Sequence, residues 1–307
     1  MASVLSAPHF HDEEAAYAYV EARIWRYGIV CPHCGGKERI SKMQGKSTRI
    51  GTYKCYHCRK PFTVKVGTIF ESSHVPMHLW LQAMYLMVGS KKGFSANQLH
   101  RVLGVTLKTA WFMAHRIRAA MESDNSRTMG DFGGSIEADE TYIGNKPNVE
   151  MRRGFSHKMK VLALVERRTG ISRSFVVKNV TARELAPIIA RNVHPASRLM
   201  TDEAAVYKTI GRGYAAHDVV NHSLGEYVRG DRHTNTVEGF FSIFKRGMRG
   251  VYQHCREKHL HRYLAEFDFR YSHRAANGVS DVQRAELALL GVVGKRLTYQ
   301  TANQASA

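Results

Sequence analysis

The sequence predicts an α+β chain built from several domains, and three observations carry that prediction. Residues 28–70 contain closely spaced Gly, Pro and Cys with short strand-like runs, whereas residues 71–121 show mainly helical periodicity. A polar, glycine-containing stretch at 122–134 then separates both regions from a series of predicted strands and helices. The 307 residues are enough for two or three domains with at least one sizeable core.

The chain is strongly basic. It has 45 Lys and Arg against 26 Asp and Glu, a net charge of +19, and the excess runs through both halves. Such a surface points first to a polyanion, most often nucleic acid, although a basic protein without that partner is the alternative until specific motifs are found. Because no apolar run could cross a bilayer and the N-terminus has no secretory pattern, we expect a cytoplasmic, nucleoid-associated protein with no membrane partner.

Four of the five cysteines form two CxxC pairs separated by 20 residues, after a predicted helix at 13–27. Two such knuckles predict a zinc ribbon, in which four thiolates hold one structural Zn²⁺. A redox role is the alternative, but the second pair and the absence of a thioredoxin pattern argue against it. A four-thiolate site leaves no open position for catalysis. The predicted zinc ligands are Cys31, Cys34, Cys55 and Cys58.

Residues 93–121 have the rhythm of a helix-turn-helix, with a tight turn at Gly104 between two helical segments. In such units the second helix enters the major groove of DNA. A plain αα-hairpin packed only for stability is the alternative. If the unit does bind DNA, the side chains available to it would be Lys108, Thr109, His115, Arg116 and Arg118.

Strand and helix patterns alternate after the linker. We expect strands at 135–144, 158–170, 171–180 and 197–204, and helices at 181–193, 237–249 and 256–275. A turn at 167–170 should join the second and third strands as a hairpin. Thr181, with Glu184 three residues later, predicts a capping box at the start of the first of these helices.

The helix at 237–249 has two different faces. Its apolar residues Val237, Phe240, Phe241, Phe244 and Met248 recur with helical spacing and predict one buried stripe. On the other side Glu238 and Lys245 lie seven residues apart, which places them about 10 Å from each other along one face. Lys245 and Arg249 would point toward bound DNA.

Three acidic residues stand out by their context. Asp139 lies in an apolar predicted strand and Asp202 ends another, where a carboxylate is costly unless it is paired or bound to metal. Glu238 follows Asp202 after 35 residues, and Lys245 follows Glu238 after six. Considered singly, each acid could be a cap, a turn residue or a solvated helix residue. Together they form a set that could bind two Mg²⁺ or Mn²⁺ ions for phosphodiester chemistry.

These motifs resemble those of bacterial insertion-sequence DDE transposases of the ISXO-like branch, which carry an N-terminal zinc ribbon. The resemblance rests on CPHC, CYHC, FTVKVGTIFESS, ADETYIGNK, TDEAAVY and the stretch that begins HTNTVEGFFSIFKRG. It implies an RNase H-like, retroviral-integrase-type catalytic domain in which Asp139, Asp202 and Glu238 are the catalytic metal ligands. In DDE relatives the third ligand can be Asn, so Asn235 is the alternative to Glu238, although the spacing selects Glu238.

The resemblance also implies the function. We expect a transposase that binds double-stranded DNA, both terminal inverted repeats and target, and acts as a homodimer or larger assembly. The rivals are a DNA-binding regulator derived from a transposase and an RNase H-like nuclease that cleaves without joining. The expected regions are an N-terminal helix (1–27), the ribbon (28–70), the helix-turn-helix region (71–128), the catalytic domain (129–280) and a C-terminal helix and tail (281–307).

Overall fold

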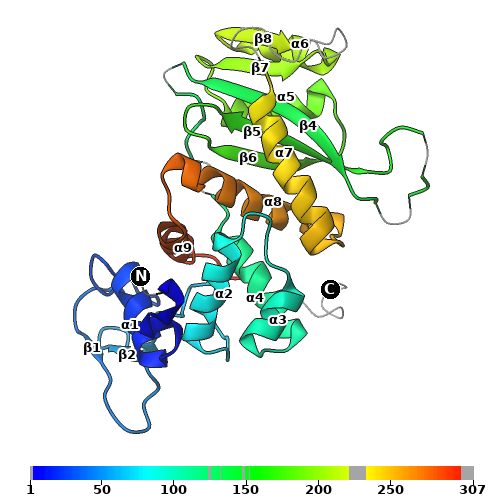
Figure 1. Cartoon of the computed structure of the whole chain (residues 1–307). Helices are drawn as coiled ribbons and strands as arrows, with labels where there is room; N and C mark the ends of the chain where they lie inside the picture. Colours follow the sequence, from blue (N-terminus) through cyan, green and yellow to red (C-terminus); the bar gives the residue numbers. More distant parts are fainter. Residues whose placement is uncertain are drawn as a thin grey trace, which may run out of the picture. The chain divides into compact units, whose positions relative to one another are not determined.

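A computed structural model describes residues 3–123, 126–131, 133–146, 149–151, 153–220 and 233–298 (Figure 1). The chain divides into two compact units. Unit 1 combines Met1–Ser90, Phe94–Met121 and Asp281–Ala307, and unit 2 combines Lys91–Gly93 and Glu122–Ser280. Both ends of the chain therefore belong to unit 1. None of the described helices is long and apolar enough to span a membrane.

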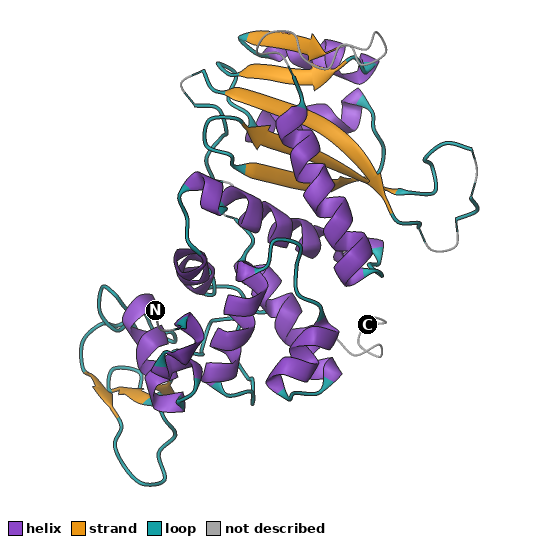
Figure 2. Ribbon diagram, viewed as in Figure 1, coloured by secondary structure: helices purple, strands orange, loops and turns teal. Residues whose placement is uncertain are grey.

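Unit 1 contains a small antiparallel sheet and a group of helices (Figure 2). Asp12 caps the first helix through the N–H of Ala15, and Gly104 ends the third in the left-handed conformation with φ of 67°. The predicted helix–turn–helix is therefore present as a structure. The elements are α1 (Glu13–Ile24), β1 (Ile40–Lys42), β2 (Tyr53–Cys55), β3 (Pro61–Phe62), α2 (Met77–Gly89), α3 (Ala96–Leu103), α4 (Leu107–Ala120) and α9 (Asp281–Leu290).

The C-terminal part of unit 1 changes one expectation about the ribbon. Only Pro61–Phe62 of the predicted strand at 60–70 pairs in the sheet, and the following residues form turns. Their backbone bonds instead to the segment after α9: Ile69 N–H donates to Val292, and Gly294 N–H donates to Gly67. The apolar pattern of this stretch reflects burial under a distant segment rather than strand pairing.

Unit 2 is built on a five-stranded mixed sheet in the order β6-β5-β4-β7-β8. The first three strands in this order are antiparallel, whereas β4, β7 and β8 run parallel to one another. The predicted hairpin joins β5 to β6, and β8 was not predicted. The strands are β4 (Ser135–Ile143), β5 (Met159–Glu166), β6 (Ser172–Val177), β7 (Arg198–Asp202) and β8 (Ala216–Val220).

Helices cover both faces of this sheet (Figures 1 and 2). One core lies between the sheet and α5 (Ala182–Asn192) with α6 (Ala205–Ile210), and the other lies under α7 (Asn235–Gly247) and α8 (Glu257–Ser272). The predicted apolar stripe of α7 is confirmed, because all five of its residues are buried in the second core. Unit 2 is therefore an α+β domain with a mixed sheet.

The expected capping box of α5 does not form. Thr181 precedes the helix, but its side chain accepts no bond from the described backbone of α5. The carboxylate of Glu184 instead accepts the N–H groups of Lys178 and Asn179, which lie before the helix. Glu184 thus orders the strand-to-helix connection rather than completing a reciprocal cap.

Candidate active site and metal centre

The four ribbon cysteines form a compact cluster. The Sγ atoms of Cys31 and Cys58 are 3.7 Å apart, and those of Cys34 and Cys55 are 3.8 Å apart. A tetrahedral zinc ion with Zn–S bonds of about 2.3 Å requires S···S edges of about 3.8 Å. Of all the described His, Cys, Asp and Glu, only these four bring three or more ligand atoms within 4.8 Å of one another. The geometry fits the structural zinc ion predicted from the spacing.

The sheet register brings the two predicted aspartates together. Parallel pairing of β4 with β7 aligns Ser135 with Arg198 and Glu137 with Met200, an offset of 63 residues. Continuing this register by two residues places Asp139 beside Asp202, the last residue of β7. Because paired strands lie about 4.8 Å apart, the two carboxylates leave neighbouring backbone positions. The interval between these aspartates in the sequence is therefore the register of the sheet.

The acids act on one another electrostatically. Burial raises the pKa of Asp139 to about 8, and the carboxylates of Glu140, Asp202 and Glu238 push it in the same direction. Their carboxylate oxygens do not, however, meet the 4.8 Å criterion that the cysteines meet among the described residues. Like charges in a partly buried site repel, and a hard divalent cation would offset that repulsion. The donor set thus fits Mg²⁺ or Mn²⁺.

Glu140 points away from this cluster, as strand alternation requires. Its carboxylate accepts the hydroxyl of Tyr207 on α6, on the opposite face of the sheet. Burial raises the pKa of Glu140 as well. Glu140 therefore influences Asp139 through charge, while its oxygens are directed to another part of the domain.

The first turn of α7 carries the third acid. Glu238 is exposed, and its Oε1 accepts the hydroxyl of Thr234 at 2.8 Å. Asn235 is the first residue of the helix and is also exposed, so it occupies the helix start, as one reading of the sequence expected. Lys245 is partly buried, and Arg249 is exposed on the turn that follows α7.

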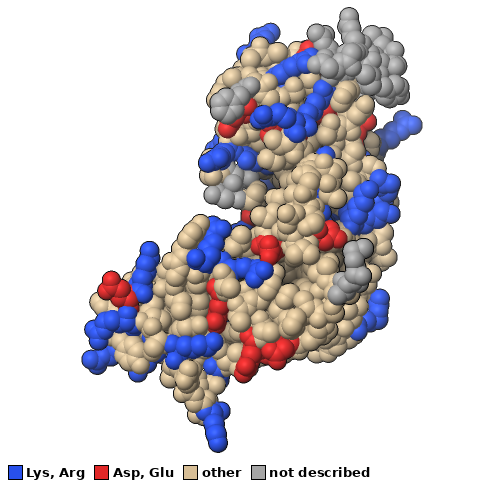
Figure 3. Space-filling view, turned by 60° about the vertical axis from the view of Figure 1, so that its left-hand side comes forward, with Lys and Arg blue, Asp and Glu red and all other residues tan. Residues whose placement is uncertain are grey.

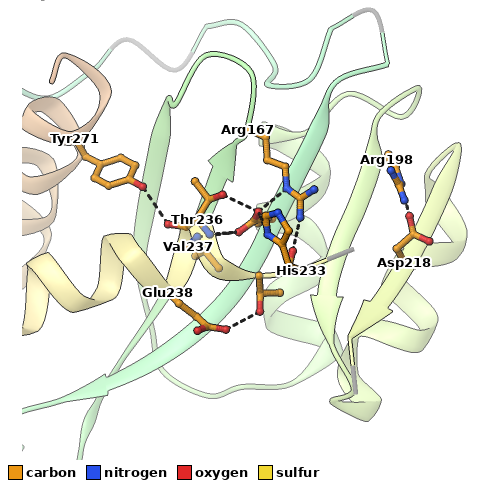
Figure 4. A network of polar contacts seen from close by, with 10 residues as sticks. Arg167, Arg198, Asp218, His233, Thr236, Val237, Glu238 and Tyr271 are labelled. Atoms are coloured by element: carbon orange, nitrogen blue, oxygen red, sulfur yellow. Dashed lines mark hydrogen bonds and ion pairs between the residues drawn. The ribbon is translucent and has the colours of Figure 1, made fainter. Parts of the chain in front are cut away.

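A buried acid that sequence reasoning missed lies two residues before Asp139 (Figure 4). Glu137 is fully buried and accepts bonds from Arg167 and from Thr236 and Val237 at the start of α7. The signal was present in the sequence: a second carboxylate on the same face of an apolar strand also needs a partner. Nothing in the spacing identified that partner.

The prediction that Arg116 is available to DNA is wrong. Arg116 is only 5% exposed, and its guanidinium donates to the carbonyls of Ile69, Glu71 and Leu297. His115 and Arg118 are buried as well. The second half of α4 therefore faces the core of unit 1.

The first turns of α4 have the opposite character. Lys108 is exposed and Thr109 is partly exposed, while the N–H of Thr109 is capped by the side chain of Thr106. Trp111 lies one turn after Leu107 and is 36% exposed. On the face of the molecule drawn in Figure 3, Lys and Arg are spread widely rather than gathered in one place.

Comparisons with known proteins agree with this arrangement. Residues 131–272 match the model of the ISXO2-like transposase domain, and residues 11–61 match that of the transposase zinc-ribbon domain. An uncharacterized protein in transposable element ISH50 of Halobacterium salinarum is 28% identical over 259 residues, 78% of this chain and 85% of the relative. The zinc ribbon and the domain that follows it thus define a transposase. The chain belongs to the ISXO2-like transposase family, as the sequence motifs indicated.

One solved structure also shows similarity. It is a chain of the simian T-cell lymphotropic virus intasome in complex with PP2A regulatory subunit B56 gamma. The match has a TM-score of 0.31 and 14% identity, and it covers 57% of this chain and 64% of that one. The chain therefore spans less than two thirds of that structure's length.

Proposed function

We propose that this protein is an insertion-sequence DNA transposase that cleaves element ends and joins them to target DNA, using Asp139, Asp202 and Glu238 as ligands of two divalent cations. The observation that carries the proposal is the β4–β7 register, which aligns the two aspartates beside the helix that bears Glu238. The sheet order supports an RNase H-like, retroviral-integrase-type fold. Its first strand lies in the middle, two antiparallel strands lie on one side, and two parallel strands lie on the other.

The residues of this chain divide the work. When bound, two Mg²⁺ or Mn²⁺ ions supply activation of the attacking oxygen and stabilisation of the leaving oxygen. Asp139 is partly buried and flanked by the other two acids, so it is suited to the shared position between the cations. Lys245, two turns along α7 from Glu238, offers a positive charge to a DNA phosphate.

Unit 1 supplies the DNA contacts in this proposal. The zinc-held ribbon and the exposed start of α4, with Lys108 and Thr109, bind the terminal inverted repeats. Arg249 contributes from unit 2. Because strand transfer joins two element ends to one target, we expect a homodimer or a larger assembly on double-stranded DNA.

The test is a strand-transfer assay with a labelled terminal repeat and Mg²⁺ or Mn²⁺. The proposal predicts joined product from the wild type, and its loss in Asp139→Asn, Asp202→Asn and Glu238→Gln with repeat binding retained. Asn235→Ala should keep measurable joining, since we assign the third ligand to Glu238. Nicking without joining would identify a nuclease, and repeat binding without either reaction would identify a regulator. Each of those two results would reject the proposal.

A further inference from the structure

The N-terminus of α7 is capped by a side chain from a different element (Figure 4). Thr236 and Val237 are the second and third residues of the helix, and their N–H groups donate to Oε2 of Glu137 at 2.8 and 2.9 Å. The hydroxyl of Thr236 donates to Oε1 of Glu137 at 2.8 Å. These N–H groups are the ones that an N-cap side chain ordinarily satisfies. Glu137 on β4 therefore serves as the cap of α7.

The residue that precedes the helix has another task. Thr234 is 1% exposed, and within the described structure its side chain accepts no bond from the first turn of α7. Its hydroxyl instead donates to Oε1 of Glu238. The local Thr thus orients the acid of the candidate active site, while the capping of the helix is left to Glu137.

Glu137 is buried together with its counter-charge. Arg167 donates its Nε to Oε1 of Glu137 and its Nη2 to the carbonyl of His233, just before α7. A buried carboxylate is costly unless it is paired and fully hydrogen-bonded. A carboxylate offers about four acceptor positions, and here Arg167 Nε, both Thr236 donors and Val237 N–H fill them. Glu137 is thus committed to protein partners and does not serve as a fourth metal ligand.

The same strand carries Asp139 two residues later. Residues i and i+2 of a strand share a face and lie about 7 Å apart. A rigid strand therefore connects the residue that caps α7 to the central acid of the site. We propose that Glu137 is a positioning residue, which docks α7 on β4 so that Glu238 is held toward Asp139. The role in metal binding rests on the proposed function, whereas the docking of α7 can be measured by itself.

The experiment compares wild type, Glu137→Gln and the control Asp268→Asn, all with zinc bound. Asp268 is matched because its carboxylate also accepts a backbone N–H and a hydroxyl, both from Ser174, but at a site away from α7. The first readout is hydrogen exchange of the peptide covering 233–241. Loss of a charged cap should speed exchange there by about tenfold in Glu137→Gln and leave it unchanged in the control.

The second readout is Mn²⁺ binding, followed by the paramagnetic resonance signal of the free ion. Residues that orient metal ligands typically contribute about 10- to 100-fold to affinity, so Glu137→Gln should bind Mn²⁺ at least about tenfold more weakly than the control. If Glu137→Gln does not fold, Glu137→Asp replaces it. That variant keeps the charge but shortens its reach, and we expect the same changes.

Three results would overturn the proposal. Unchanged exchange at 233–241 would show that Glu137 does not dock α7. Faster exchange with unchanged Mn²⁺ affinity would make Glu137 a cap without a role in positioning the acid. Equal weakening of Mn²⁺ binding in Asp268→Asn would point to general destabilisation. The failure of the proposed function is a separate result, namely no joined product from the wild type, and it leaves the exchange comparison valid.

Discussion

Replacing Arg116 by Met tests whether this arginine is a structural anchor of unit 1. The guanidinium donates to Ile69 O at 2.6 Å, to Glu71 O at 2.9 Å and to Leu297 O at 3.2 Å. Leaving a buried carbonyl unsatisfied costs about 1–3 kcal/mol, and removing the buried charge offsets part of the total. We therefore expect unit 1 to lose about 3 kcal/mol of unfolding free energy.

Tryptophan fluorescence is a selective probe for this change. The three tryptophans, at positions 25, 80 and 111, all belong to unit 1. With a urea dependence of about 2 kcal/mol/M, a loss of 3 kcal/mol lowers the unfolding midpoint by about 1.5 M. The control is Lys108→Met on the exposed start of the same helix, whose midpoint should change little.

The same two variants separate anchoring from DNA contact. Lys108→Met should weaken terminal-repeat binding and reduce its salt dependence by about one unit of slope. At a urea-free temperature where both variants are folded, Arg116→Met should leave that slope unchanged. An unchanged midpoint for Arg116→Met, together with a reduced salt slope, would refute the structural assignment and restore the DNA-contact reading.

Two further predictions concern the ribbon and the pH dependence of unit 2. Chelation of zinc, or Cys55→Ser, should unfold the ribbon, seen as a loss of protection from proteolysis confined to 28–62; a protease pattern identical to that of the zinc-loaded protein would contradict this. Burial raises the pKa of Asp268 from 3.8 to about 6, so its stabilising contribution is complete below about pH 3.8 and is lost as pH rises through 6. Asp268→Asn should lack this loss, and because the residue is partly exposed we expect a difference of about 1–2 kcal/mol between pH 4 and pH 7 in urea unfolding followed by circular dichroism. Parallel pH profiles for the two proteins would contradict that assignment.

The elements with strong periodicity were predictable from the sequence. The buried stripe of α7 and the run of strands from β4 to β7 follow from patterns that depend on neighbouring residues. The short elements α6 and β8 were missed, because five or six residues carry too little pattern to stand out. Likewise, the turns at 63–70 resembled a strand because their burial comes from a segment more than 200 residues away.

The site shows the same division between local and distant information. The positions of Asp139, Asp202 and Glu238 could be proposed from spacing, and their alignment follows from the sheet register. The role of Glu137 depends on a helix start 100 residues later, which no local pattern reveals. The burial of Arg116 was missed for a related reason: a basic side chain on an amphipathic helix is usually solvated, and its partners here are distant carbonyls.

The most direct test of the central claim is anomalous diffraction from crystals of the protein grown with terminal-repeat DNA and Mn²⁺. We predict manganese peaks bounded by the carboxylates of Asp139, Asp202 and Glu238, and a separate zinc peak among the four cysteines. Manganese located away from Asp139 and Asp202 would contradict the proposed active site. A peak bound by Asn235 in place of Glu238 would contradict the assignment of the third ligand.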